Sequence, residues 1–463
     1  MFPLLLFIVA IPFLSILLLI VLPERLSKKI QQISSIIILI LSLLLVYSFS
    51  TSTQSLIQPI TFNYLGFTGS FQVTSITLIL ELMCAIVFTS SSIGIDYFIK
   101  DNIRIYSILF ALIQGSAIAL FLSSNLLLLY VFWEIAEFSM FFIIYLYGAS
   151  NRKYAAIKFI IYSLISSLFL LIAILLIYVN VTPSTFQISQ IITNASTMPT
   201  FIQEIVLLFL VISFMIKIPI FPFHNWLPDA HTEAPTTGSM ILAGILLKFG
   251  GYGLILTSLM LPIFSKYSLY LAGIFILSSF YSVFVAIKQT NLKKLIAYSS
   301  ITDMAIVSLG IVSNSTLGIN GALYGMLGHA ISISMLFLLA GTLKEIYGSL
   351  DLSVLKGIMK DYASLAYLFI IGVFATVGIP LTVGFIGDIL IFSAAFSSFG
   401  IIGLLPLLSI IILGSVMFWV IERVFLNGRS SPNGYLVKSV FYSEIFLLFF
   451  SLLLGIAPFI LIH

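Results

Sequence analysis

The chain has 463 residues, of which 61% are hydrophobic and only 8% charged, with a mean hydropathy of +1.22. This composition excludes a soluble globular domain. The single cysteine, Cys84, excludes a disulfide within the chain and an iron–sulfur cluster held by cysteines of this chain alone. The net charge of +4 is small and gives no sign of nucleic-acid binding.

Apolar segments of about 20 residues recur along the whole chain, and each is long enough to cross a bilayer as a helix. We therefore predict an all-α integral membrane protein with fourteen transmembrane helices. The predicted spans are 2–22, 30–49, 73–95, 104–122, 125–148, 154–180, 202–224, 235–261, 269–288, 294–313, 318–342, 361–395, 400–426 and 439–460. The first span has neither a basic region nor a cleavage site, so we interpret it as a retained helix. No transit peptide rich in Arg and Ser is expected either.

The placement of charge supports this count. All but three of the twenty Lys and Arg residues lie in, or beside, the loops after predicted helices 1, 3, 5, 9, 11 and 13. The exceptions are Lys266 on the opposite side, and Lys217 and Lys248 inside helices. By the positive-inside rule, the basic loops face the cytoplasm or matrix, and both termini lie on the other side. The longest polar stretches, 50–72 and 181–201, are predicted on that other side too.

Charged or titratable residues inside the predicted helices are the informative ones. Each charge costs roughly 2.5–3.5 kcal/mol on insertion scales, so each needs a partner, a water-filled cavity or a function. These residues are Glu81 in helix 3, Glu134 and Glu137 in helix 5, Lys217 in helix 7, Lys248 in helix 8, His329 in helix 11 and Asp388 in helix 12. Because buried ion pairs stabilise poorly compared with apolar packing, stability alone does not explain the set.

Acid, base and imidazole groups spaced across a membrane interior are what a proton relay requires. Burial disfavours the charged form of a group and an opposite charge favours it, so a Glu–Lys pair that forms and breaks can take up or release a proton. None of the deep basic residues is arginine, which cannot be deprotonated. Structural alternatives stay open for His329 as a helix–helix hydrogen-bond partner, Glu81 as a capped or water-facing residue, and Glu137 as a solvated neighbour of Glu134.

Two predicted helices are broken close to these charges. Pro219 and Pro222 remove amide donors just after Lys217, and Pro380 does the same ahead of Asp388. Broken helices at membrane depth are tolerated only beside a cavity or inside protein. The texts "KIPI" and "GIPL" match weakly around the two breaks, and the offset of five helices predicts two inverted five-helix repeats, helices 4–8 and 9–13. The predicted divisions are an N-terminal three-helix segment (1–100), a first repeat (101–262), a second repeat (263–430) and a C-terminal helix (431–463).

The segment "KIPIFPFHNWLPDAHTEAPTTGSMILAGILLKFGGYG" resembles the most characteristic part of the antiporter-like subunits of respiratory complex I. "FWE" in helix 5 and "NLKKLIAYSSITDMA" at the start of helix 10 extend the resemblance over about residues 100–430. An acid in broken helix 12, here Asp388, is typical of one of these subunits. The other large antiporter-like chains, and the related multisubunit sodium/proton antiporters, generally carry a lysine there.

The resemblance implies a proton-translocating membrane-arm subunit that couples NADH:ubiquinone oxidoreduction on other subunits to proton pumping. The alternative is a stand-alone or multisubunit cation/proton antiporter subunit. A purely structural scaffold is disfavoured by the buried charges.

The resemblance also implies a role for each relay residue. Glu134 matches the helix 5 glutamate that pairs with the helix 7 lysine, Lys217, and Lys248 matches the central helix 8 lysine. His329 lies at a polar position of helix 11 that links the two halves. Asp388 matches the acid through which the path connects outward, where the family usually has the longer Glu, so a bridging water is expected.

Further residues are secondary candidates for the proton path, and several mark departures from the family. They are Glu137, His224, His231, Asp303 and Glu81. The family usually has His at the position of Asp303, and Thr74 stands near the place of its helix 3 Asp. His224, Asp229 and His231 lie in the loop after helix 7, where they either guide protons or cap helix ends.

No cofactor and no metal site is expected in this chain, because no G-x-G-x-x-G follows a strand and no flavin, haem or cluster signature is present. FMN, iron–sulfur clusters and ubiquinone are expected on partner subunits. The expected partners are the other membrane-arm and peripheral subunits of complex I, membrane lipids, protons and water, without nucleic acid. Length and an Ile-, Phe- and Leu-heavy composition favour the mitochondrial inner membrane, with both termini on the intermembrane-space side. A bacterial plasma membrane or a plastid thylakoid stays open.

Overall fold

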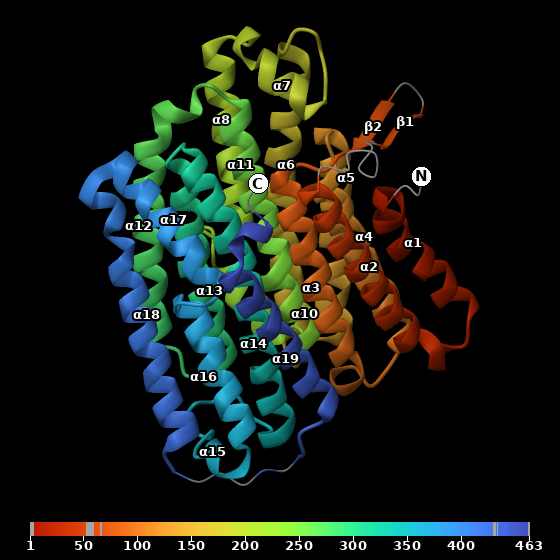
Figure 1. The fold of residues 1–463 in the computed structure, drawn as a ribbon, viewed down its shortest axis with the longest axis vertical. Helices are drawn as coiled ribbons and strands as arrows, with labels where there is room; N and C mark the ends of the chain where they lie inside the picture. The colour runs from red at the N-terminus through yellow and green to blue at the C-terminus, as the bar shows by residue number, and fades with distance from the viewer. Residues whose placement is uncertain (1–3, 52–59, 65–66, 429–431, 433, 462–463) are drawn as a thin grey trace.

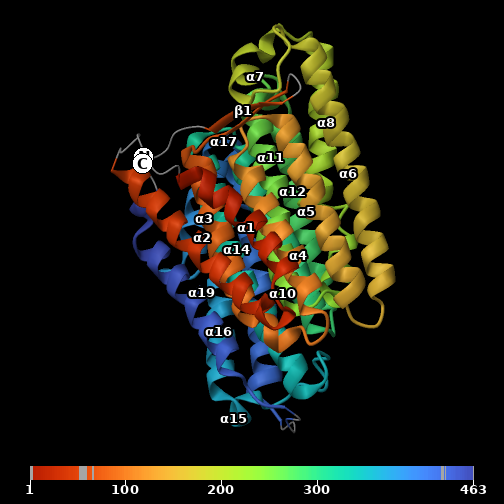
Figure 2. The ribbon, with the colours of Figure 1, turned by 90° about the vertical axis from the view of Figure 1, so that its right-hand side faces the viewer.

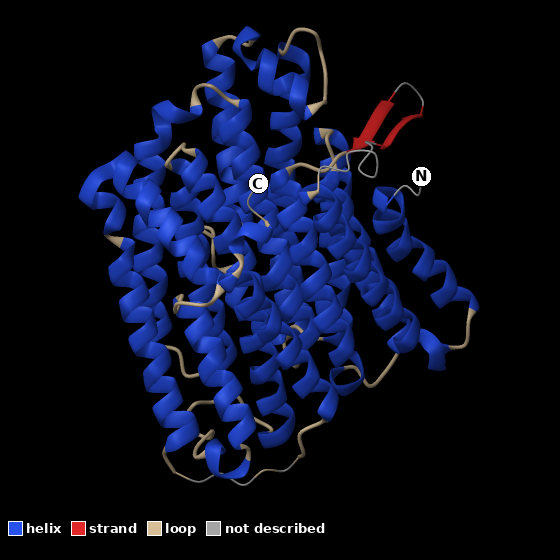
Figure 3. Cartoon of the chain, viewed as in Figure 1, coloured by secondary structure: helices blue, strands red, loops and turns tan. Residues whose placement is uncertain are grey.

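The structure, a computed structural model, describes every residue except 1–3, 52–59, 65–66, 429–431, 433 and 462–463. Among the residues described, fourteen helices are long and apolar enough to cross a membrane, which confirms the predicted fourteen spans. The chain is therefore a multi-pass, all-α membrane protein, and Figure 3 shows helix throughout its body. Arg429, counted above among the basic-side residues, lies outside the described residues.

Three helices precede the first five-helix group: α1 (Leu4–Val21), α2 (Ser27–Ser50) and α3 (Ser75–Phe98). A short 3-10 turn, Glu24–Leu26, joins α1 to α2. Strands β1 (Ile60–Tyr64) and β2 (Phe67–Phe71) form an antiparallel pair between α2 and α3, where the sequence predicts only a polar stretch. Figure 1 shows this pair at the same end of the molecule as the chain's N-terminus.

Predicted helices 4–8 form the next group. Their elements are α4 (Ile103–Leu122), α5 (Leu126–Tyr147), α6 (Arg152–Asn180), α7 (Ile188–Asn194), a 3-10 turn (Ala195–Thr197), α8 (Thr200–Lys217), α9 (Trp226–Glu233), α10 (Thr236–Ile241), a π-helical segment (Leu242–Leu246) and α11 (Leu247–Met260). Helix α8 ends at Lys217, ahead of the predicted limit, because Pro219 and Pro222 cannot donate backbone hydrogen bonds. The segment that follows, predicted as a loop, contains the short helix α9 (Trp226–Glu233).

Predicted helices 9–14 complete the chain. Their elements are α12 (Phe264–Ile287), α13 (Leu292–Val312), α14 (Thr316–Tyr347), α15 (Ile358–Asp361), α16 (Ala363–Val377), α17 (Val383–Phe399), a 3-10 turn (Gly400–Leu404), α18 (Pro406–Val420), a π-helical segment (Ile421–Leu426), α19 (Lys438–Ile456) and a 3-10 turn (Pro458–Ile460). The predicted twelfth span is two half-helices, α16 and α17, separated at Pro380 as expected. Leu381, within this break, has a φ of 82°, a left-handed conformation that non-glycine residues rarely adopt.

The two five-helix groups pack in the same order, in agreement with the predicted repeats. Helix α4 packs on α5 and α6 packs on the broken α8, while α12 packs on α13 and α14 packs on the broken α17. The last helix of each group contains a π-helical segment. Figures 1 and 2 show the second group beside the first, with α14 near the middle of the bundle. The residue limits of the four divisions stay a prediction.

Glycines permit the close crossing of α14 and α17. A Cβ atom on Gly321 would lie 2.7 Å from the backbone N of Ile391, and one on Gly328 would lie 2.6 Å from Cα of Gly384. Small residues let membrane helices approach each other closely. This crossing holds α17 and its Asp388 against α14 and its His329.

We expect Gly321→Ala to lower the free energy of unfolding by about 1–3 kcal/mol, because the new methyl group meets backbone atoms that cannot move aside. The measurement is thermal unfolding of the purified protein in detergent. Gly273→Ala is the matched control, since a Cβ on Gly273 meets no atom within 4 Å. Equal melting temperatures for the two variants would show that the crossing tolerates larger residues.

Candidate functional site

Lys217 lies at the end of α8 in a fully enclosed site. Its Nζ is 2.5 Å from Oε1 of Glu137 on α5, and both side chains are 1% exposed. Four aromatic rings surround the ammonium at 5.6–6.0 Å from their centres: Trp133, Phe159, Trp226 and Phe249. A carboxylate partner and the faces of aromatic rings are both contacts that favour a positive charge at this position.

The prediction that Lys217 pairs with Glu134 is wrong. The resemblance pointed to Glu134, whereas the structure pairs Lys217 with Glu137. Residues three apart on a helix differ in direction by about 60°, so the two acids on α5 cannot both face the end of α8 equally. Glu134 is only half-buried, and the reading of Glu137 as its solvated neighbour is excluded because Glu137 is buried.

Side chains satisfy the backbone groups that the break after α8 exposes. The indole N–H of Trp226 donates to the carbonyl of Ile216 at 3.0 Å. The backbone N–H of Phe221 donates to the hydroxyl of Ser278 at 3.1 Å. The break is therefore stable at membrane depth because it is enclosed in protein.

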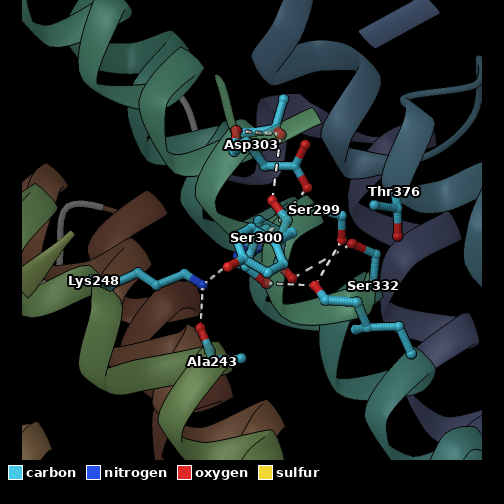
Figure 4. A network of polar contacts seen from close by, with 12 residues as sticks. Ala243, Lys248, Ser299, Ser300, Asp303, Ser332 and Thr376 are labelled. Atoms are coloured by element: carbon cyan, nitrogen blue, oxygen red, sulfur yellow. Dashed lines mark hydrogen bonds and ion pairs between the residues drawn. The ribbon is translucent and has the colours of Figure 1, made fainter. Parts of the chain in front are cut away.

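Lys248 lies two residues after the end of the π-helical segment Leu242–Leu246. Its ammonium donates to the carbonyl of Ala243 at 2.7 Å and lies 2.6 Å from Nδ1 of His329 on α14. The wider π turn leaves a carbonyl that a regular α-helix would use in its own hydrogen bonding. When Lys248 is charged, its ammonium donates and Nδ1 of His329 accepts, which leaves the proton of the neutral imidazole on Nε2. Figure 4 shows the Lys248 side chain reaching from its helix toward this polar network.

Asp303 continues the network beyond His329. Its Oδ2 lies 3.9 Å from Nε2 of His329. Figure 4 shows Asp303, Ser299 and Ser300 on α13 facing Ser332 and Thr376. A cavity of about 30 Å³, large enough for bound water, is lined by Asp303, His329, Ser332, Thr376 and Asp388 among others. The secondary candidate Asp303 therefore lies between His329 and Asp388.

Asp388 lies between two cavities. Besides the small inner one, it lines a second cavity of about 530 Å³ whose other walls are mostly apolar, including Phe385, Phe392 and Leu407. The carboxylate of Asp388 lies against Gly378 at the helix break. A Cβ atom on Gly378 (φ 75°) would collide with Oδ2 of Asp388. Gly378 thus provides both the left-handed turn and the space for the carboxylate.

Two further predicted candidates, His231 and His224, lie close to the lysine sites. His231 on α9 is fully buried, stacks on Phe337 at 4.4 Å and lies within the electrostatic reach of Lys293 and Lys248, so it borders the relay. His224 is buried with its ring 4.9 Å from that of Tyr281, between the break and α12.

Asp229 and Glu81 lie elsewhere. Asp229 pairs with Lys158 at 2.7 Å and with Lys294 at 3.9 Å. Glu81 on α3 is fully buried and accepts a hydrogen bond from Ser42 on α2 at 2.6 Å, so it is not water-facing at the surface. Glu444 on α19 is also fully buried and is not among the predicted site residues. The signal for it in the sequence is a lone acid in an apolar span.

We expect Glu137→Ala to cost about 3–5 kcal/mol of unfolding free energy, because Lys217 would be left as an unpaired buried charge. Glu134→Ala on the same helix is the matched control and should cost clearly less. Chemical unfolding in detergent measures both, and Glu137→Ala combined with Lys217→Met should recover part of the loss. Equal costs for the two alanine variants would contradict the observed pairing.

Comparison with known proteins places this geometry in a family. The family described as NADH:quinone oxidoreductase/Mrp antiporter, TM, matches residues 123–414. The chain is 36% identical over 374 residues to NADH-quinone oxidoreductase subunit M of Rickettsia prowazekii (strain Madrid E), covering 79% of this chain and 75% of that one. It is 33% identical over 435 residues to NADH-ubiquinone oxidoreductase chain 4 of Chondrus crispus, covering 90% and 86%.

The fold has a close counterpart among solved structures. A chain of respiratory complex I from Thermus thermophilus with bound NADH superimposes with a TM-score of 0.88, covering 98% of this chain and 96% of that one. The two sequences are 24% identical, so this likeness establishes the fold.

Proposed function

Because this chain belongs to the NADH:quinone oxidoreductase/Mrp antiporter transmembrane family, we propose that its buried acid and base side chains carry protons across the membrane. The chain is a proton-translocating membrane-arm subunit of respiratory complex I, corresponding to subunit M or chain 4, and acts as part of the NADH:quinone oxidoreductase. The alternative of a separate cation/proton antiporter subunit is not favoured, since both relatives are oxidoreductase subunits.

The observation that carries the relay proposal is the order of contacts from Lys248 to Asp388. Lys248 touches Nδ1 of His329, whose Nε2 lies near Asp303, and a small cavity joins Asp303 to Asp388. A proton from the ammonium can pass to Nδ1 while the proton on Nε2 moves toward Asp303. Lysine suits this step because its amine can lose a proton, which arginine cannot.

The pair of Lys217 and Glu137 forms the first half of the proposed path. Phe249, the residue after Lys248, lies with its ring 5.9 Å from the ammonium of Lys217, so Lys217 contacts the helix that carries Lys248. Loss or gain of the Lys217–Glu137 contact changes the charge near this helix. We infer that this change favours proton uptake or release at Lys248.

The second cavity beside Asp388 supports an outward role for this acid. The cavity is lined by Asp388 but not by His329, and it is open to the surface of the bundle. In the proposal, Asp388 receives a proton through the inner cavity and releases it through the outer one. The shorter side chain of Asp, relative to the usual Glu, requires a water in the inner cavity.

The redox reaction belongs to other subunits in this proposal. One cysteine cannot supply the thiolates that an iron–sulfur cluster needs. FMN, iron–sulfur clusters and ubiquinone are therefore assigned to partner subunits, and this chain contributes only proton transfer.

For the location, we infer the mitochondrial inner membrane, with the basic loops on the matrix side and both termini on the intermembrane-space side. The relative from Chondrus crispus named chain 4 supports this inference, and the relative from Rickettsia makes a bacterial plasma membrane the competing location. Antibody detection of the chain in purified mitochondrial and plasma-membrane fractions distinguishes the two.

We expect Asp388→Asn to remove most of the proton flux per NADH oxidised, because the amide keeps the shape and hydrogen bonding of the acid but does not titrate. Asp388→Glu restores the family's usual side chain and should retain flux. Reconstituted vesicles containing the whole complex provide the measurement, with NADH oxidation in the presence of an uncoupler as the control for assembly. Unchanged flux in the Asn variant would place the outward path elsewhere.

A further inference from the structure

Lys293 lies buried at the basic end of the bundle, outside the contacts of the relay. It is the second residue of α13 and is only 2% exposed. Its ammonium donates to the carbonyl of Ala234 at 2.8 Å, and among the described residues it forms no ion pair. An ammonium has three N–H donors, so the described part of the chain accepts only one of them.

The surroundings of Lys293 compensate its charge poorly. Burial disfavours the ammonium, and the amino end of α13 carries a partial positive charge of its own. Lys344 on α14 is close enough to repel the ammonium, and Glu233 at the end of α9 is close enough to attract it without forming an ion pair. The carboxylate of Glu233 instead accepts from the backbone N–H of Asn151 at 2.8 Å. A lysine in this position can exist as an ammonium or as a neutral amine, so it can bind and release a proton.

The next residue, Lys294, shows the ordinary arrangement of a lysine at a helix end. Its side chain is 39% exposed, and its ammonium lies 3.9 Å from Oδ1 of Asp229. Lysines near the ends of membrane helices commonly extend to the aqueous surface in this way. Because the two lysines are consecutive, Lys293 lies directly beneath a surface that water reaches, and its burial is the feature that needs an explanation.

Helix α14 gives the order of the buried groups across the membrane. Three of its residues mark the levels of Lys248, His231 and Lys293, in that order. They are His329, which contacts Lys248, Phe337, which stacks on His231, and Lys344, which is within electrostatic reach of Lys293. At the rise of an α-helix, the first two levels differ by about 12 Å and the last two by about 10.5 Å. The ring of His231 therefore lies between the two lysines.

The ring of His231 is the polar group that joins these levels. It is fully buried, and neither of its nitrogens has a hydrogen-bond partner in the described part of the chain. A neutral imidazole always has one N–H donor and one acceptor nitrogen. Native proteins satisfy such buried atoms, and bound water does so where protein groups do not. The stack on Phe337 covers a face of the ring and leaves both nitrogens at its edge for water.

Buried hydroxyls lie between His231 and Lys248. Ser239 donates to the carbonyl of His231 at 3.2 Å and lies one helical turn before Ala243, whose carbonyl accepts from Lys248. Ser334 on α14 donates to the carbonyl of the residue after Ser239 at 3.5 Å. Both hydroxyl groups are fully buried, and a hydroxyl both donates and accepts, so these serines provide hydrogen-bonding groups for water in the interval.

We propose that Lys293 takes up protons from the basic side of the membrane and supplies them, through water bound at His231, to Lys248. The inference rests on the proposed function and names the inward supply of that path. The neutral amine of Lys293 accepts a proton from water and forms one N–H bond. The ammonium then gives a proton to bound water, the ring of His231 accepts a proton on one nitrogen and releases one from the other, and the neutral amine of Lys248 receives it. Each N–H or O–H bond that breaks is matched by one that forms.

The first test uses Lys293→Arg in the assembled complex, reconstituted in vesicles. Arginine keeps the positive charge and can donate to the carbonyl of Ala234, but it cannot lose its proton. We expect the number of protons translocated per NADH to fall as far as in Asp388→Asn, because the two residues lie in series on one path. The double variant should fall no further. Lys294→Arg is the matched control and should leave the number unchanged, and NADH oxidation with an uncoupler reports assembly.

Asp388→Asn, measured in parallel, separates the two proposals. A normal number of protons per NADH in Lys293→Arg, together with a loss in Asp388→Asn, overturns the supply route and leaves the relay standing. A double variant that loses more than either single variant also overturns it, because the two residues would then serve different paths. A normal number in Asp388→Asn contradicts the proposed function itself.

His231→Phe tests the middle of the route, and it does so even if Lys293→Arg fails to assemble. Phenylalanine keeps an aromatic ring against Phe337 but has no ring nitrogen, so we expect the same loss of protons per NADH. Phe337→Leu is the matched control, since it removes the stack, keeps both nitrogens and should retain the flux. An unchanged number of protons in His231→Phe overturns the route. So does an equal loss in Phe337→Leu, because the stack rather than the nitrogens would then be what matters.

Discussion

The cost of placing a charge in the membrane interior is the constraint on which the rest of this structure depends. Lys217 is held there by Glu137 and by aromatic ring faces, and Lys248 by a backbone carbonyl and the imidazole of His329. Apolar side chains in place of either lysine and its partner would be expected to stabilise the protein at least as well. We attribute the presence of the two lysines to proton transfer. Each lies where a small movement changes whether its charge is compensated by a neighbouring group.

The backbone irregularities supply the compensating groups. The π-helical segment before Lys248 frees the carbonyl of Ala243, and the break after Val377 opens space for Asp388 above Gly378. The break after Lys217 is closed by Trp226, a residue that also faces the ammonium. In each case, a departure from regular helix lies beside a titratable side chain in space, and we infer that backbone shape and proton binding are coupled there.

Much of the architecture could be predicted because the bilayer leaves few choices. Length and apolarity fixed the fourteen spans, and Pro219, Pro222 and Pro380 fixed the breaks, since proline removes a helical hydrogen bond wherever it stands. The partner of Lys217 could not be predicted, because two acids three residues apart share a helix face and only the rotation of α5 decides between them. The position of Asp303 near His329 and Asp388 depends on contacts among three helices that spacing does not reveal. The β1–β2 pair and the polar interior of α2 were missed for the same reason, since both depend on which neighbours the segment meets.

The central claim is that a proton passes from Lys248 through the ring of His329 toward Asp303. The most direct measurement is the number of protons translocated per NADH by vesicles containing the complex with His329→Asn, whose side-chain oxygen can still accept from Lys248 but cannot pass a proton through the residue. The account predicts that the flux is largely lost while NADH oxidation with an uncoupler continues. Flux equal to that of the unmodified complex would contradict it.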